Sequence, residues 1–221
     1  MSYRFPAAVC FVLMILVGLI GSACSKEDLI PVSGLITDPN QAIPVEGAKV
    51  EIWTQQIEGG IFTANYVLAG SAITGIDGTF LFNLENKNYT GIRLKLGKEG
   101  YYGWEPEINL DKIKTDHSFY AVYQLLPGAV LKIRVKNSEP FGSDDYFEFR
   151  ILNGYSGCEE CCKGEKYQFT GMDVDQTIDC KTSGHQDILI QWSKRKNGEQ
   201  IFKTDSYFVK AFQETGIELN Y

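Results

Sequence analysis

The residues most able to carry chemistry are four cysteines in the last third of the chain: Cys158, Cys161, Cys162 and Cys180. The first two have the Cys-x-x-Cys spacing found in redox sites and in zinc sites. A redox site of this type places its first thiol at a helix N-terminus, where the pKa falls, but Glu159 and Glu160 separate these thiols and disfavour a thiolate. A zinc site needs a second cysteine pair or a histidine pair, and His185 is the single histidine nearby. We therefore expect no metal and no cofactor.

Other combinations of residues give weaker catalytic signals. The chain contains two histidines, His117 and His185, and no serine lies in a nucleophile-elbow glycine pattern. A Ser-His-Asp arrangement could still assemble in space, so an envelope hydrolase or redox enzyme stays as an alternative. The acidic pairs at 144–145 and 173–175 lack the spacing of a calcium loop and are expected to be solvated turn residues. We expect a non-enzymatic protein.

The segment Tyr101-Tyr102-Gly103-Trp104 is the best candidate for ligand contact. Exposed rings of Tyr101, Tyr102 and Trp104 could stack on sugar faces. Glu105 or Glu107 could then accept hydrogen bonds from sugar hydroxyls. The alternative is that the rings pack into the sheet, as half-buried aromatic residues in strands commonly do.

The N-terminus indicates where the protein resides. Arg4, an apolar run to Ile20 and the small residues Gly-Ser-Ala resemble a signal peptide that ends at Cys24. This pattern is similar to the lipobox of bacterial lipoproteins, here of Bacteroidota type, in which the cysteine is lipidated, for example with palmitate. The resemblance implies a signal peptide at 1–23, a tether at 24–30 and an outer-membrane protein facing the periplasm or the cell surface. An uncleaved transmembrane anchor is the alternative.

An exported chain favours disulfides. With Cys10 in the signal and Cys24 lipidated, the four remaining cysteines form an even set. A bridge between the neighbours Cys161 and Cys162 would strain the peptide, so we expect Cys180 to pair with one of them and Cys158 with the other. The formal net charge of −7 and the lack of a basic cluster exclude nucleic-acid binding.

Period-two alternation dominates the rest of the chain and predicts an all-β fold. Residues 131–135, 147–151 and 188–192 alternate apolar and polar side chains, as strands of antiparallel sandwiches do. Pro127 and Gly128 interrupt the pattern, which predicts two tandem antiparallel sandwiches at 31–126 and 127–221. One extended sandwich is the alternative.

The first of these domains resembles a known module. An opening strand at 32–38, Pro-Val-x-Gly-Ala at 44–48, Thr-Gly-Ile-Asp-Gly at 74–78 and Gly-Lys-Glu-Gly-Tyr at 97–101 are similar to the carboxypeptidase regulatory-like, transthyretin-like β-sandwich, a Greek-key fold. The resemblance implies a non-catalytic spacer or accessory module. The second domain is expected to be Ig-like, and the segment Thr54–Ala64 is the expected variable loop.

Together these patterns predict a membrane-anchored envelope lipoprotein with a structural or partner-binding role. The expected partner is an envelope protein or a glycan, and the membrane is contacted through the lipid. A glycan-binding accessory of a nutrient-uptake system is the first alternative, and it requires an exposed platform at Tyr102 and Trp104.

Overall fold

The computed structural model of the protein describes residues 28–58, 61–62 and 65–221. The predicted signal peptide, Cys24 and the first part of the predicted tether lie outside the described residues. The same is true of residues 59–60 and 63–64 of the expected variable loop. Within the described part of the chain, no helix is long and apolar enough to cross a membrane.

The prediction of an all-β fold is confirmed, since strands follow one another along the chain with a short helix between β7 and β8. The elements are β1 (Leu29–Asp38), β2 (Ile43–Pro44), β3 (Lys49–Glu58), β4 (Ile61–Phe62), β5 (Val67–Ile73), β6 (Thr79–Glu85), β7 (Tyr89–Gly97), α2 (Leu110–Asp116), β8 (Phe119–Gln124), β9 (Gly128–Lys136), β10 (Tyr146–Ile151), β11 (Lys166–Thr170), β12 (Asp175–Ser183), β13 (Gln186–Lys196), β14 (Glu199–Val209) and β15 (Glu214–Asn220).

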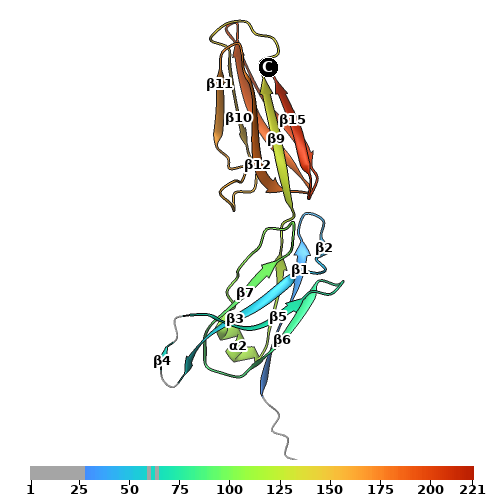
Figure 1. Ribbon diagram of the computed structural model, residues 1–221, viewed down its shortest axis with the longest axis vertical. Coiled ribbons are helices and arrows are strands. Elements are labelled where there is room, and N and C mark those ends of the chain that lie inside the picture. Colours follow the sequence, from blue (N-terminus) through green and yellow to red (C-terminus); the bar gives the residue numbers. More distant parts are fainter. Residues whose placement is uncertain (1–27, 59–60, 63–64) are drawn as a thin grey trace, which may run out of the picture.

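The strands form two sandwiches that lie end to end (Figure 1). In the N-terminal sandwich, β1 lies between β6 and β8, and β3 lies between β5 and β7. In the C-terminal sandwich, β9 lies between β12 and β15, opposite the sheet β11-β10-β13-β14. Each sandwich has its own apolar core. Leu125 belongs to the N-terminal core and Ala129 to the C-terminal core, and these two residues lie on either side of the predicted boundary at 126/127.

Alternation of side chains along the strands accounts for both cores. Strand β10 buries Phe147, Phe149 and Ile151, each 1% exposed, while the residues between them face outward. Strand β1 alternates in the same way over its whole length. Period-two patterning thus places one face of each sheet in the dry interlayer.

Beside their antiparallel pairs, both sandwiches also contain parallel strand pairing. Strand β1 pairs in parallel with β8, and β9 pairs in parallel with β15. In each sandwich the first strand is central, with β6 or β12 antiparallel on one side and the last strand on the other. Because the last strand enters from the opposite sheet, its direction is set by that crossover and not by a hairpin. Alternation reveals which face is buried but not which strand lies alongside.

Helix α2 was not predicted from the sequence, and it ends at Asp116. The Asn109 side chain caps the start of the helix by accepting from the backbone N–H groups of Asp111 and Lys112, and His117 closes it with a φ of 50°. The predicted tether to residue 30 is too long, since Leu29 and Ile30 already pair with β6.

Candidate functional site: the joint between the two sandwiches

The segment after β7, where we predicted ligand-contacting aromatic residues, lies at the joint between the two sandwiches. Its backbone bonds directly to the connecting segment: the Tyr102 N–H donates to the Leu126 carbonyl at 2.9 Å, and the Gly128 N–H donates to the Gly100 carbonyl at 2.7 Å. These bonds hold both ends of the connection between β8 and β9. The connection is therefore part of the folded structure and not a loose linker.

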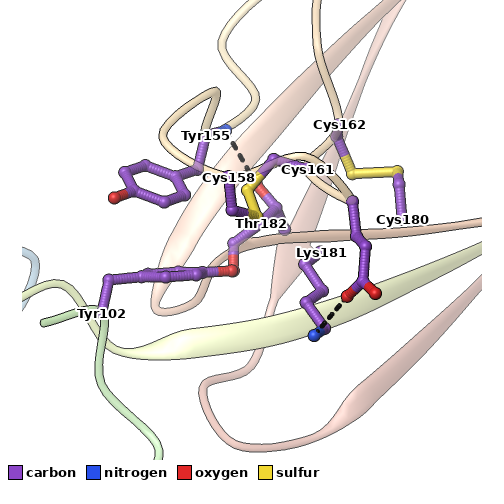
Figure 2. Close-up of a disulfide and its surroundings, with 9 residues drawn as sticks. Tyr102, Tyr155, Cys158, Cys161, Cys162, Cys180, Lys181 and Thr182 are labelled. Atoms are coloured by element: carbon purple, nitrogen blue, oxygen red, sulfur yellow. Dashed lines mark hydrogen bonds and ion pairs between the residues drawn. A yellow bond between two sulfur atoms is a disulfide. The ribbon is translucent and has the colours of Figure 1, made fainter.

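Tyr102 reaches across the joint into the C-terminal sandwich (Figure 2). Its ring lies 4.1 Å from the ring of Tyr155, centroid to centroid, and its hydroxyl donates to the Thr182 carbonyl at 3.0 Å. Burial raises the pKa of Tyr102 to about 12, with a further contribution from Tyr155. The hydroxyl therefore stays protonated and remains a donor at every physiological pH.

Tyr101 makes a second aromatic contact across the joint. Its ring centroid lies 5.2 Å from that of Phe212, which follows β14. Gly100 has a φ of 81° and passes so close that a Cβ there would lie 2.8 Å from the Phe212 ring. The positive φ and the close approach both require glycine at this position.

Two further hydrogen bonds link the sandwiches through Gly184, in the turn between β12 and β13. The Gly184 N–H donates to the Pro127 carbonyl at 2.8 Å, and the Asn40 side-chain amide donates to the Gly184 carbonyl at 2.7 Å. The Phe212 N–H donates to the Gly128 carbonyl at 2.7 Å. Three segments of the C-terminal sandwich, around residues 155, 184 and 212, thus contact the joint.

Cys158, Cys161 and Cys162 lie in the same loop as Tyr155, and Cys180 lies in β12 (Figure 2). The structure joins Cys158 to Cys161 and Cys162 to Cys180, which is one of the two pairings left open by the sequence. The second bridge ties the loop between β10 and β11 to β12.

Backbone bonds strengthen this attachment of the loop to β12. The Cys162 N–H donates to the Lys181 carbonyl at 2.8 Å, and the Lys181 N–H donates to the Glu160 carbonyl at 2.9 Å. The Tyr155 N–H donates to the Thr182 hydroxyl at 3.2 Å. The loop that carries the disulfides therefore also carries Tyr155, whose ring contacts Tyr102.

The Cys-x-x-Cys segment does not have the geometry of a low-pKa thiol site. Cys158 lies in a loop and not at the start of a helix, and Cys161 is 6% exposed. Its bridge closes a short turn beside the longer Cys162–Cys180 bridge. The arrangement is that of a structural clamp.

Trp104 lies apart from the two tyrosines. Its indole is 49% exposed and meets Tyr123 of the N-terminal sandwich edge-on, with centroids 5.8 Å apart. Tyr101 and Tyr102 are already in contact with rings of the C-terminal sandwich. Of the three predicted residues, Tyr101 and Tyr102 therefore lie at the joint and Trp104 lies on the surface. They do not form one exposed aromatic platform.

The two histidines lie in different sandwiches. His117 caps helix α2, and His185 follows β12 with a φ of 52°. Two of the four carboxylates considered for calcium bond to protein groups: Asp175 accepts two hydrogen bonds from Arg134, at 2.8 and 2.7 Å, and the buried Asp145 accepts from Asn137 at 2.9 Å. Over the described ranges, no three or more His, Cys, Asp or Glu side chains form a group able to hold a metal ion.

Sequence reasoning missed most of the joint. It identified Tyr101, Tyr102 and the cysteines, but not that they act together. Most of the missed contributors come from turns and loops that carry no periodic signal: Asn40, Tyr155, Gly184 and Phe212. Thr182 lies in β12 and contributes through its backbone carbonyl, which no side-chain pattern reveals. Tyr155 was the one within reach of inference, because it lies three residues before a disulfide-bonded cysteine.

No protein-family model matches the chain, and no curated protein matches it. Among solved structures it is similar to the Bacillus anthracis TIE protein, at 14% identity and a TM-score of 0.34, over 87% of this chain and 33% of that one. It is also similar to a streptococcal ancillary pilin, at 14% identity and a TM-score of 0.32, over 89% and 63% of the two chains. The shaft pilin SpaA from Lactobacillus rhamnosus GG matches at 8% identity and a TM-score of 0.29, over 87% and 97%. The chain thus spans a third of the first protein and under two thirds of the second, and no family assignment follows from these likenesses.

Proposed function

We propose that the protein is a non-enzymatic, lipid-anchored lipoprotein of the bacterial envelope that acts as a stiff two-domain spacer and presents its far end to a partner. The observation that carries the proposal is the joint. Backbone hydrogen bonds restrain Leu126, Pro127 and Gly128 of the connection, and two aromatic contacts join the sandwiches beside it. Relative motion of domains is the default unless the interface is large and hydrophobic, so the proposed stiffness rests on these bonds and ring contacts.

The arrangement of the chain fits a spacer. Strand β1 begins at the outer end of the N-terminal sandwich, and the C-terminus lies at the opposite end of the C-terminal sandwich (Figure 1). An anchor at Cys24 would attach the first end to the membrane and hold the second away from it. An envelope protein or a glycan is the proposed partner.

The anchor is tested by metabolic labelling with a palmitate analogue in cells that process bacterial lipoproteins. The full chain is expected to take up label, and Cys24→Ser is expected to lose it, because the thiol is the proposed acceptor. Cys10→Ser is the matched control, since that cysteine lies within the proposed signal. Label that survives Cys24→Ser would contradict the anchor.

The spacer is tested separately, by spin-label distance measurements between exposed positions on β5 and β14, with labels attached through noncanonical residues so that the disulfides stay intact. One narrow distance distribution is expected, because three segments of the C-terminal sandwich contact the joint. Tyr102→Ala should broaden it, whereas Tyr120→Ala, at a 64% exposed tyrosine of β8, should not. A broad distribution in the unaltered protein would contradict stiffness without bearing on the anchor.

A further inference from the structure

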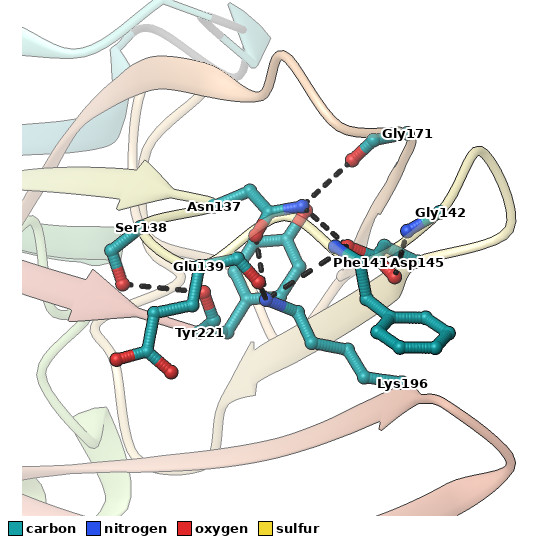
Figure 3. Close-up of polar contacts among 9 residues, drawn as sticks. All are labelled: Asn137, Ser138, Glu139, Phe141, Gly142, Asp145, Gly171, Lys196 and Tyr221. Atoms are coloured by element: carbon teal, nitrogen blue, oxygen red, sulfur yellow. Dashed lines mark hydrogen bonds and ion pairs between the residues drawn. The ribbon is translucent and has the colours of Figure 1, made fainter.

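Three polar side chains lie together in the C-terminal sandwich (Figure 3). They are at the end remote from the joint, since β9 starts at the joint with Gly128 and ends just before Asn137. Asn137 directly follows β9, Asp145 directly precedes β10, and Lys196 is the last residue of β13. Asn137 is 6% exposed and Asp145 1% exposed, and the Lys196 side chain is 14% exposed. Buried lysines and aspartates are rare unless they are paired, and these three side chains bond to one another.

The contacts bring an amine, a carboxamide and a carboxylate together. The Lys196 Nζ donates to the Asn137 Oδ1 at 2.6 Å and to the Glu139 carbonyl at 2.7 Å. The Asn137 Nδ2 donates to the Asp145 Oδ2 at 2.9 Å and to the Gly171 carbonyl at 3.0 Å. The same Asp145 oxygen lies 3.9 Å from the Lys196 Nζ. One carboxylate oxygen therefore faces both the amine and the amide nitrogen.

This geometry is close to that needed for attack on the amide. The Cγ of Asn137 is one C=O bond, about 1.2 Å, from the oxygen that the lysine contacts. The Lys196 Nζ is therefore no more than about 3.8 Å from that carbon, near the separation of reacting atoms in a near-attack arrangement. A small rotation of either side chain would place the nitrogen over the carbonyl carbon.

The surroundings favour a reactive amine. Burial lowers the pKa of Lys196, which makes the neutral amine more accessible. A desolvated lysine of this kind is a stronger nucleophile than one in water.

The carboxylate is held in place by the loop between β9 and β10. The Phe141 N–H donates to the Asp145 Oδ2 at 2.8 Å, and the Gly142 N–H donates to its Oδ1 at 3.1 Å. These bonds, the Phe141 bond first, lower the pKa of Asp145 and keep it ionised. Its Oδ2 is thus held 3.9 Å from the Lys196 Nζ and 2.9 Å from the Asn137 Nδ2, within reach of both nitrogens.

We propose that Lys196 and Asn137 form an intramolecular amide bond, with Asp145 as the proton carrier. Asp145 accepts a proton from the Lys196 ammonium group, and the neutral amine attacks the Asn137 Cγ. The Nζ–Cγ bond forms as the carbonyl π-electron pair moves to Oδ1. Asp145 passes its proton to Nδ2, and the Cγ–Nδ2 bond breaks as the C=O bond is restored. The remaining proton on Nζ leaves with the departing ammonia as ammonium, and Asp145 is left as a carboxylate.

The proposed bond would join the two layers of the C-terminal sandwich. Strand β9 belongs to one sheet and β13 to the other. The Cys162–Cys180 bridge lies toward the joint, whereas Asn137 and Lys196 lie at the opposite end. The amide would thus secure the end that the disulfides do not reach, and it would resist reduction.

The test is peptide mapping by mass spectrometry of the purified, reduced protein. Trypsin should release 137–150 joined to 196–203, because cleavage after an acylated Lys196 is blocked, and the joined mass should be one ammonia below the sum. Separate peptides, with cleavage after Lys196, would overturn the proposal. A succinimide at Asn137 or Asn197 also loses ammonia but joins no peptides, so that result would overturn it too.

Variants test the assigned roles. Asp145→Asn and Lys196→Arg are expected to give no joined peptide, whereas Asp144→Asn and Lys194→Arg, at neighbouring positions outside the group, should keep it. A joined peptide in Asp145→Asn would overturn the role of Asp145. If Asp145→Asn fails to fold, Lys196→Arg, which keeps the charge, supplies the unlinked comparison: its thermal midpoint should fall below that of Lys194→Arg, and equal midpoints would overturn the proposed stabilisation.

Discussion

Gly184 shows how one residue can set the spacing of the joint. A Cβ at this position would lie 2.3 Å from the Cα of Ala211, a backbone atom that cannot move aside as a flexible side chain can. The same glycine bonds to Pro127 and Asn40 through its own backbone. Close approach of two backbones, and not backbone flexibility, is the reason for glycine here.

We expect Gly184→Ala to lower the free energy of unfolding by about 2 kcal/mol, because the added methyl group must push two backbone segments apart. Gly216→Ala is the control, since a Cβ there meets no atom within 4 Å, and it should change stability by less than about 1 kcal/mol. Urea unfolding of both variants measures the difference. Equal effects would show that the joint tolerates the extra volume.

Among elements, the outer face of β10 carries a polar cluster built across three strands. The Glu148 carboxylate accepts from the Tyr146 hydroxyl at 2.6 Å and from the Ser193 hydroxyl at 3.2 Å, and it lies 3.1 Å from the Lys166 Nζ. These contacts, the Tyr146 hydrogen bond first, lower the pKa of Glu148 to about 2. Cross-strand pairing of β10 with β11 and β13 brings the donors together.

The pH dependence of this cluster follows from the lowered pKa. A depressed carboxylate contributes stability that is fully present above its ordinary pKa of 4.5 and is lost as the pH falls toward about 2. We expect the stability difference between the unaltered protein and Glu148→Gln to shrink over that range. Glu199→Gln, at an exposed position on β14, should show no such trend in urea unfolding at stepped pH. A constant difference for Glu148→Gln would contradict the cluster.

At the scale of the whole molecule, the disulfides and the joint are connected through the loop between β10 and β11. The Cys162–Cys180 bridge closes a loop with a sequence separation of 18. A bridge of that span contributes on the order of 3 kcal/mol. The bridge also attaches the loop that carries Tyr155 to β12, and this keeps Tyr155 in contact with Tyr102.

We therefore expect reduction of the folded protein to broaden the distance distribution between the sandwiches, because Tyr155 is then released. Spin-label distances before and after reductant measure this. Tyr155→Ala should be broad already, and reduction should add little to it. If reduction leaves the unaltered protein narrow while circular dichroism shows it folded, the disulfides act only within the C-terminal sandwich.

Particular residues show how far the sequence could lead. Alternation identified Phe147, Phe149 and Ile151 as a buried face, and all three are 1% exposed. The joint was only partly predictable, because Tyr102 meets Tyr155 and Thr182 at sequence separations of 53 and 80 residues. No local pattern records contacts of that range.

The sequence by itself determined the all-β fold and which strand faces are dry, because a strand's two faces are encoded in alternate residues. It also predicted an even set of cysteines for pairing. Only the tertiary structure decided that the last strand of each sandwich pairs in parallel with the first, that Tyr101 and Tyr102 serve a joint, and that Asn137, Asp145 and Lys196 share one buried site. Those outcomes depend on which distant segments become neighbours, and that is set by packing of the whole chain.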